Sequence, residues 1–274
     1  MSEISAQSAP QFVEVAMIGA PPYIPKLRIA TLSQAARDAN RPGLVWLQGF
    51  KSEMTSTKAT HLAHWCARTG LGLTRFDYSG HGQSGGKFED GTLGQWLGES
   101  IEVITRLTQG PQILVGSSMG GFMALLAARH FNGRAKEGES LRIAGLVLIA
   151  PAWDMITQLM EPRLPPEGRM MIERNGVWNR PSHYGDGPYP ITRGLIEEGK
   201  RHSLAGTGFD PRCPVRILHG IQDPDVPWQH SMRLVDELTC EDLRVTLIKD
   251  GEHRLSRERD LALLTSTIAE LAGV

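Results

Sequence analysis

Two copies of the pattern Gly-x-Ser-x-Gly place a serine inside a tight turn, where its hydroxyl could act as a nucleophile. Residues 116–120 centre on Ser118, and residues 82–86 centre on Ser84. A nucleophile in such a turn needs a strand before it, a helix after it and small flanking residues. The apolar run 113–115 precedes Ser118 and an Ala- and Leu-rich segment follows it, so this copy predicts a nucleophile. No strand leads directly into Ser84, which we interpret as a turn serine.

A serine hydroxyl is a weak nucleophile, and it needs a histidine to accept its proton and a carboxylate to orient that histidine. With this turn, the expected chain order is serine, acid, histidine, each in a loop after a strand. Of nine histidines, His253 lies in that place, after the apolar run 245–248, and is the predicted base. His81, in a Gly-rich turn, is the strongest alternative, but it precedes Ser118. His219, which ends an apolar run, is interpreted as a turn residue.

The acid is expected in the segment that follows the apolar run 215–218. Two aspartates stand there, Asp223 and Asp225. Asp223 is favoured because it lies deeper in the turn and Pro224 fixes the backbone beyond it. Asp225 stays open as a turn or helix-start carboxylate.

Acyl transfer also needs backbone N–H groups that stabilise the oxyanion. Met119 follows the nucleophile at the start of a helix, so its N–H is one expected donor. The second is expected from Phe50, in the loop after the apolar run 44–47, where Gly49 lets the backbone approach a substrate. The alternative is that Gly49 merely ends that strand.

Apolar runs alternate with helical patterns along most of the chain, which predicts the elements that must position these residues. Helices are expected at 55–68, 92–107 with Thr92 as N-cap, 122–130, 228–238 and 256–271. Strands are expected at 12–18, 27–32, 44–47, 72–78, 113–116, 143–150, 215–218 and 245–248. The alternation predicts an α/β fold with a mostly parallel eight-stranded sheet and helices on both faces. Ligands bind at the carboxyl ends of such strands.

One segment, 152–212, breaks the alternation. It is rich in Pro and Gly, shows no clear buried strand and is too long for an ordinary connection. We therefore expect a lid inserted into a core domain made of 1–151 and 213–274. The Met and Leu residues of the lid and Trp178 either line an acyl pocket or pack the lid's own small core.

Composition excludes several classes of function. The chain has 274 residues, 41% of them hydrophobic, and a formal net charge of -1. Such a balance gives no field that would attract nucleic acid. Three dispersed cysteines argue against disulfides, and no Cys/His cluster or nucleotide-binding glycine pattern occurs. We expect no cofactor and no metal.

The location is predicted from the segment 1–11 and from the longest apolar runs. The segment is polar and lacks a basic amphipathic or apolar address. No apolar run reaches the roughly 18 residues that a membrane-spanning helix needs. These features predict a cytoplasmic protein without a membrane span.

With these residues in place, the chain resembles the α/β-hydrolase superfamily along nearly its whole length. The resemblance rests on residues 49–50, 77–84, 116–120 and 219–223. It is closer to the mitochondrial acyl-protein thioesterases (depalmitoylases) and acyl-glucuronide esterases of the α/β-hydrolase-domain family. That closer resemblance is carried by Thr57-Lys58-Ala59, 75–80, 110–118, Gly176-Val177-Trp178, Pro181-Ser182, Tyr184, Cys213-Pro214, Val226-Pro227-Trp228, Ser231-Met232 and His253-Arg254.

The resemblance implies an α/β-hydrolase fold and a triad of Ser118, Asp223 and His253. The chain departs from the pattern at Gln48, where many superfamily members have His, and it lacks a mitochondrial transit segment at 1–11. Gln48 bears on the geometry of the oxyanion loop, and the composition of residues 1–11 bears on the predicted compartment.

These observations predict a serine hydrolase that forms an acyl-enzyme on Ser118 and cleaves acyl esters or thioesters. Its partner is then a small-molecule acyl ester or thioester, or an S-acylated protein. Two alternatives stay open: a carbon–carbon bond hydrolase of dienoate type with the same triad, and a non-catalytic scaffold. The sequence predicts no oligomeric state.

Overall fold

An eight-stranded sheet forms the centre of the computed structural model, which describes residues 9–17, 26–135, 142–181 and 187–274. Its strands are β1 (Gln11–Val15), β2 (Leu27–Gln34), β3 (Gly43–Leu47), β4 (Leu73–Phe76), β5 (Gln112–Ser117), β6 (Ile143–Ile149), β9 (Val215–Gly220) and β10 (Leu243–Ile248). They lie in the order β1-β2-β4-β3-β5-β6-β9-β10. The pairs β1–β2 and β2–β4 are antiparallel, and the remaining pairs are parallel. The predicted, mostly parallel eight-stranded sheet is confirmed.

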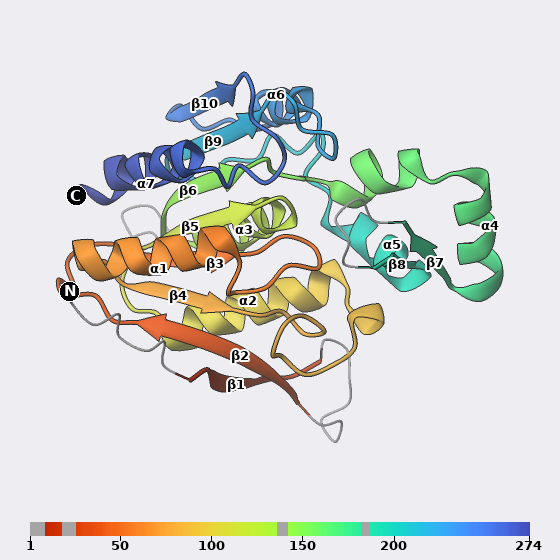
Figure 1. Cartoon of the computed structure of the whole chain (residues 1–274), viewed down its shortest axis with the longest axis horizontal. Coiled ribbons are helices and arrows are strands. Elements are labelled where there is room, and N and C mark those ends of the chain that lie inside the picture. The colour runs from red at the N-terminus through yellow and green to blue at the C-terminus, as the bar shows by residue number, and fades with distance from the viewer. Residues whose placement is uncertain (1–8, 18–25, 136–141, 182–186) are drawn as a thin grey trace.

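Helices cover both faces of this sheet (Figure 1). One layer contains α1 (Thr57–Thr69) and α7 (Glu258–Ala272), and the other contains α2 (Leu93–Leu107), α3 (Met119–Phe131) and α6 (Trp228–Glu237). The central strand explains why two layers are needed. Leu114 of β5 packs in one hydrophobic cluster, whereas its neighbours Ile113 and Val115 pack in the other. Because side chains alternate along a strand, β5 is buried on both faces.

Local sequence explains the two helices next to the site. Thr92 accepts a hydrogen bond from the Gln95 N–H at 3.2 Å, which confirms it as the N-cap of α2. Helix α3 is apolar all round, and the ten residues from Met119 to Ala128 are buried. A helix of this kind lies in the interior, so it holds the turn that precedes it firmly.

The remaining elements of the sheet and its helices lie where they were predicted, with ends that differ by a few residues. The largest differences are of three residues: α3 begins at Met119 instead of 122, and β1 ends at Val15 instead of 18, a residue that lies outside the described ones. Short turns of 3₁₀ helix follow β4 and α3, at η1 (Phe88–Asp90) and η2 (Asn132–Arg134). No helix in the described ranges has the length and apolarity that crossing a membrane requires.

The segment between β6 and β9 has more regular structure than its sequence indicated. It lies beyond the carboxyl ends of the parallel strands (Figure 1). Its elements are η3 (Met155–Met160), η4 (Glu161–Arg163), α4 (Pro166–Asn175), β7 (Val177–Arg180), β8 (Tyr189–Thr192), α5 (Arg193–Gly199) and η5 (Lys200–His202). The sequence missed the β7–β8 hairpin because its four-residue strands are too short to show an alternating pattern.

Asp154 ties the beginning of this segment to its end. Its buried carboxylate accepts the N–H groups of Leu204 and Ala205 at 2.8 and 3.1 Å and the hydroxyl of Ser203. The residue has a positive φ of 46°. These bonds hold the beginning and the end of the segment together next to the edge of the sheet.

Candidate active site

Ser118 lies at the junction of β5 and α3 in a backbone conformation that is rare for a residue with a side chain. Its φ is 55° and its ψ is -118°. The turn has no room for larger neighbours, because a Cβ atom at Gly116 would lie 2.2 Å from the Gly120 carbonyl oxygen, and one at Gly120 would lie 1.9 Å from that of Leu47. The strained turn places Ser118 at the carboxyl edge of the sheet, where the pattern predicted a nucleophile.

Asp223 and His253 form a hydrogen-bonded pair. Nδ1 of His253 lies 2.6 Å from Oδ2 of Asp223. The other carboxylate oxygen accepts the N–H groups of Asp225 and Val226 at 2.8 and 2.9 Å. Burial raises the pKa of Asp223, but hydrogen bonds from His219 and His253 outweigh it and hold this pKa well below its ordinary value. The ionised carboxylate therefore keeps the proton of His253 on Nδ1 and leaves Nε2 as an acceptor.

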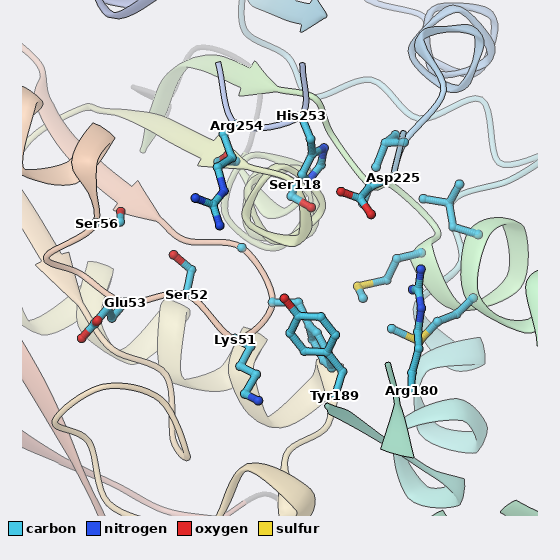
Figure 2. Close-up of a pocket in the computed structure, with 18 of the residues that line it drawn as sticks. Lys51, Ser52, Glu53, Ser56, Ser118, Arg180, Tyr189, Asp225, His253 and Arg254 are labelled. Carbon is cyan, nitrogen blue, oxygen red and sulfur yellow. The ribbon is translucent and has the colours of Figure 1, made fainter. Parts of the chain in front are cut away.

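The structure brings Ser118 and His253 to the same cavity. In Figure 2 the His253 ring is directed toward the Ser118 side chain. Among the described residues no hydrogen bond joins the two side chains, a contact that often tightens only when a substrate is bound. Of the two aspartates that the sequence left open, Asp223 makes the bond to Nδ1.

Asp225 faces the cavity next to this pair (Figure 2). Ligand atoms of Asp223, Asp225 and His253 lie within 4.8 Å of one another, a spacing that a metal ion could bridge. Two of the three are already bonded to each other, and a zinc site would need them as separate ligands. The arrangement fits a histidine with its orienting carboxylate better than an open metal site.

The predicted oxyanion loop lies against the nucleophile. A Cβ atom at Gly49 would lie 3.3 Å from the Ser117 carbonyl oxygen and 3.4 Å from Cβ of Ser118, so the backbone of Gly49 comes close to the nucleophile turn. Phe50 follows, with its ring packed edge-on against Phe88 at a centroid distance of 4.9 Å. Met119, which follows Ser118 in the chain, is the first residue of α3 and is fully buried.

Asp77 holds the rest of this loop, a role that the sequence did not reveal. Its Oδ1 accepts the N–H of Met54 at 2.6 Å and the side-chain amide of Gln48 at 3.3 Å, and its Oδ2 accepts the N–H of Gln83. Gln48, which replaces the histidine of many superfamily members, therefore ties the loop to the turn after β4.

His81 belongs to the same support. Its Nε2 accepts the N–H of Lys51 at 3.1 Å, and Nδ1 lies 3.0 Å from the Ser79 carbonyl oxygen. Burial lowers the pKa of His81 to about 4, so the ring is neutral with its proton on Nδ1. Both ring nitrogens are occupied in shaping the loop. Its position in a glycine-rich turn after a strand was the signal in the sequence.

His219 also has a role beyond the turn that was expected. It lies within β9 and is fully buried. The hydroxyl of Ser231 donates to Nδ1 at 2.6 Å, so Nε2 carries the proton that is donated to the Val226 carbonyl oxygen at 2.8 Å. The same nitrogen is 3.4 Å from Oδ2 of Asp223. His219 therefore lies against the Asp223 carboxylate and helps to hold it in place.

Ser84, the centre of the second Gly-x-Ser-x-Gly pattern, acts as a turn serine. Its hydroxyl donates to the Asp77 carbonyl oxygen at 2.6 Å and accepts the N–H of Ala30 at 2.8 Å. These bonds join the turn after β4 to β2, and Ser84 is absent from the residues that line the cavity.

The cavity has a volume of about 470 Å³ and two chemically different sides. Figure 2 shows Ser52, Ser56 and Arg254 to one side of Ser118 and Arg180 to the other. The polar side is lined by Ser52, Ser56, Lys58, Arg254 and Ser256. The segment between β6 and β9 supplies the other side, called the apolar side here, with Met155, Leu159, Met160, Tyr189 and Ile191 together with the charged Arg163 and Arg180. Other apolar residues of the segment pack within it: Trp178 lies against Gly168 of α4 and does not line the cavity.

Comparison with known proteins places this geometry in a family. Residues 39–175 match the family described as serine aminopeptidase, S33. The bovine mitochondrial palmitoyl-protein thioesterase ABHD10 is 38% identical over 232 residues, which cover 84% of this chain and 72% of that protein. The human protein of the same name is 37% identical over 231 residues, with the same coverage.

Two solved structures are also similar. A putative hydrolase from Agrobacterium vitis superposes with a TM-score of 0.89 at 40% identity and covers 96% of this chain and 98% of its own. The mouse α/β-hydrolase domain-containing protein 10 superposes with a TM-score of 0.81 at 33% identity, over 96% of this chain and 98% of its own. These likenesses confirm the α/β-hydrolase fold that the resemblance implied.

One prediction is wrong by the same comparisons. The chain was expected to be cytoplasmic, but these thioesterases are named as mitochondrial proteins, in the rodent relatives as well as in the bovine and human ones. The expectation rested on the composition of residues 1–11. A compartment address is read by a receptor and is independent of the fold that it accompanies, so that composition does not decide the location.

The fold, the matched family and the similarity to these enzymes lead to one conclusion: the chain belongs to the α/β-hydrolase family.

Proposed function

We propose that this hydrolase cleaves acyl thioesters or esters through an acyl-enzyme on Ser118, with His253 as the base and Asp223 as its anchor. The observation that carries the proposal is the 2.6 Å bond between Nδ1 of His253 and Oδ2 of Asp223, in a cavity shared with Ser118. An acid–histidine pair beside a serine in a strained turn is the arrangement that acyl transfer requires.

In the first step, Nε2 of His253 accepts the proton of Ser118 while Oγ attacks the acyl carbonyl. Asp223 keeps its bond to Nδ1 and stabilises the imidazolium that forms. The N–H groups of Phe50 and Met119 stabilise the oxyanion, and loss of one such donor costs about 3 kcal/mol in comparable enzymes. The imidazolium then protonates the leaving thiol or alcohol, and water releases the acyl group by the same steps.

The two sides of the cavity suit the two parts of the substrate: the acyl chain on the apolar side and the leaving group on the polar side. Met155, Leu159 and Met160 offer an adaptable apolar wall for an acyl chain. Residues 152–212 then act as a lid over a core of 1–151 and 213–274. The similarity to enzymes named palmitoyl-protein thioesterases supports an S-acylated protein as substrate. A small acyl ester, such as an acyl glucuronide, uses the same machinery.

The decisive test is Ser118→Ala. We expect it to abolish both turnover of an acyl thioester and labelling by a fluorophosphonate, with an unchanged melting temperature. Ser84→Ala is the matched control, because it removes the serine of the other Gly-x-Ser-x-Gly copy and should leave labelling of the folded protein intact. Labelling that persists in Ser118→Ala would refute the nucleophile, and a wild type that turns over a dienoate but no ester or thioester would favour carbon–carbon bond hydrolysis.

A further inference from the structure

Lys58 occupies a position that is unfavourable for a lysine on two grounds. It is the second residue of α1, where the positive end of the helix dipole repels a cation. It is also only 9% exposed, and burial lowers the pKa of its ammonium group to about 8. The first turn of α1 contains no acidic residue that would compensate. A residue that breaks two local rules is often retained for function.

The ammonium group of Lys58, which lines the cavity, contacts the loop that carries the proposed base. It donates a hydrogen bond to the main-chain carbonyl of Arg254, the residue that follows His253. Glu252 and Asp260 act on it only through their charge, and among the described residues neither forms an ion pair with it. Its partner is therefore a neutral carbonyl oxygen of that loop, 196 positions along the chain.

The other described contacts of this loop are mostly local. The hydroxyl of Ser256 also donates to the Arg254 carbonyl at 3.0 Å, and the N–H of Leu255 bonds to the Glu252 carbonyl at 3.3 Å. The N–H of Gly251 bonds to the Ile248 carbonyl at 3.0 Å, and the Gly251 carbonyl accepts the N–H of Gln222 at 2.8 Å. Leu255 is buried with a positive φ of 42°. The bonds of Leu255 and Ser256 stay within the loop, and the bond to Asp223 orients the His253 ring. The bond from Lys58 joins the residue after the base to α1, on the side of the oxyanion loop.

We propose that Lys58 is a positioning residue: by holding the Arg254 carbonyl, it sets the distance between the His253 ring and Ser118. This role rests on the proposed function of Ser118 and His253. A displacement of about 1 Å in such a pair lowers the rate by about 100-fold in well-studied enzymes, so a contact one residue from the base is well placed to control the reaction.

The experiment compares wild type with Lys58→Met, which keeps the length of the side chain and removes the donor. We expect kcat for an acyl thioester to fall by about tenfold or more and KM to stay within about threefold of wild type. Amide hydrogen exchange of residues 249–257 should become faster, while the melting temperature does not fall. A merely structural lysine would lower the melting temperature and leave kcat per folded molecule unchanged.

Arg212→Met is the matched control. This arginine also donates to main-chain carbonyl groups, those of Asn132 and Ala135 at 2.7 and 2.6 Å, but it is not among the residues that line the cavity. Its loss should leave kcat unchanged. If Lys58→Met does not fold, Lys58→Leu, which also removes the donor, gives the same measurements.

The outcomes separate this inference from the proposed function. A wild type that hydrolyses thioesters and is labelled on Ser118, together with a Lys58→Met variant whose kcat stays within about twofold, overturns only the role of Lys58. A rise in KM alone would also overturn it, because Lys58 would then hold the substrate. An inactive wild type would refute the proposed function. Amide hydrogen exchange of residues 249–257 in wild type and Lys58→Met would still show whether Lys58 orders the loop.

Discussion

At the scale of single residues, the two aspartates after β9 show what a pattern can and cannot decide. Asp223 and Asp225 stand two positions apart in the same turn, and both satisfy the expected chain order. The structure separates them by burial and direction: the side chain of Asp223 is inaccessible and bonds to His253, whereas Asp225 faces the cavity. Such a difference depends on how the turn folds over β9, which residue types alone do not encode.

This difference predicts unequal effects of the same substitution. Asp223→Asn should lower kcat by about 10⁴-fold, because the amide favours the wrong tautomer of His253. Asp225→Asn is the matched control and should lower kcat by less than about tenfold, since no hydrogen bond to Nδ1 is lost. Steady-state kinetics with one thioester at neutral pH measures both. Equal losses in the two variants would contradict the assignment of the acid.

Lys58 predicts a pH-dependent stability with a definite sign. Lowering its pKa from 10.5 to about 8 corresponds to about 3 kcal/mol against the folded state. Between these two pH values the unfolded chain binds a proton that the folded protein does not, so stability rises with pH, and below pH 8 the full cost is present. Glu252, Arg254 and Asp260 are the charged groups that act on Lys58.

Lys58→Met should therefore be more stable than wild type at pH 7, although the proposed role makes it slower. The gain should shrink as the pH rises from 8 to 10.5, because the wild-type lysine is then neutral in the folded protein. Urea unfolding at several pH values measures the difference. A variant that is less stable at pH 7, by the same amount at every pH, would show that the lost hydrogen bond outweighs the buried charge.

At the scale of elements, the sheet, its helices and the nucleophile turn could be predicted because each leaves a local pattern. Buried parallel strands read as apolar runs, and the turn at Ser118 needs glycines on either side. The support of the oxyanion loop leaves no such pattern, since Asp77 and His81 accept the backbone N–H groups of Met54 and Lys51, which are distant in sequence. The β7–β8 hairpin was missed for a related reason: its strands are short and half-buried.

The oxyanion loop and the turn after β4 are predicted to work as one unit. His81→Ala removes the acceptor of the Lys51 N–H, so the loop that carries Phe50 should move away from Ser118. We expect kcat to fall by about tenfold to 100-fold, less than the full loss of an oxyanion donor. His81→Gln, which keeps a polar acceptor, should recover part of the rate. Stopped-flow labelling by a fluorophosphonate measures the acylation step, and unchanged labelling in His81→Ala would contradict the link.

At the scale of the whole molecule, the location of the active site follows from the topology. Parallel strands bring Ser118, the oxyanion loop and the loops after β9 and β10 to one edge, and the segment between β6 and β9 closes over that edge (Figure 1). The compartment does not follow from the topology, and the prediction of a cytoplasmic location was wrong. The assembly does determine the shape of the cavity, because its apolar side comes from one segment and its polar side from two others.

This division predicts that the apolar side selects the acyl chain. Met160→Trp should fill part of the 470 Å³ cavity and shift preference toward shorter acyl thioesters, because added volume on that wall removes space for the distal carbons. Met170→Trp is the matched control: Met170 lies on α4, is 44% exposed and is not a lining residue. The trend of kcat/KM across thioesters of about two to sixteen carbons measures the shift. If Met160→Trp lowers kcat/KM equally for every chain length, the acyl group lies on the polar side, and the apolar wall serves only to pack the lid against the core.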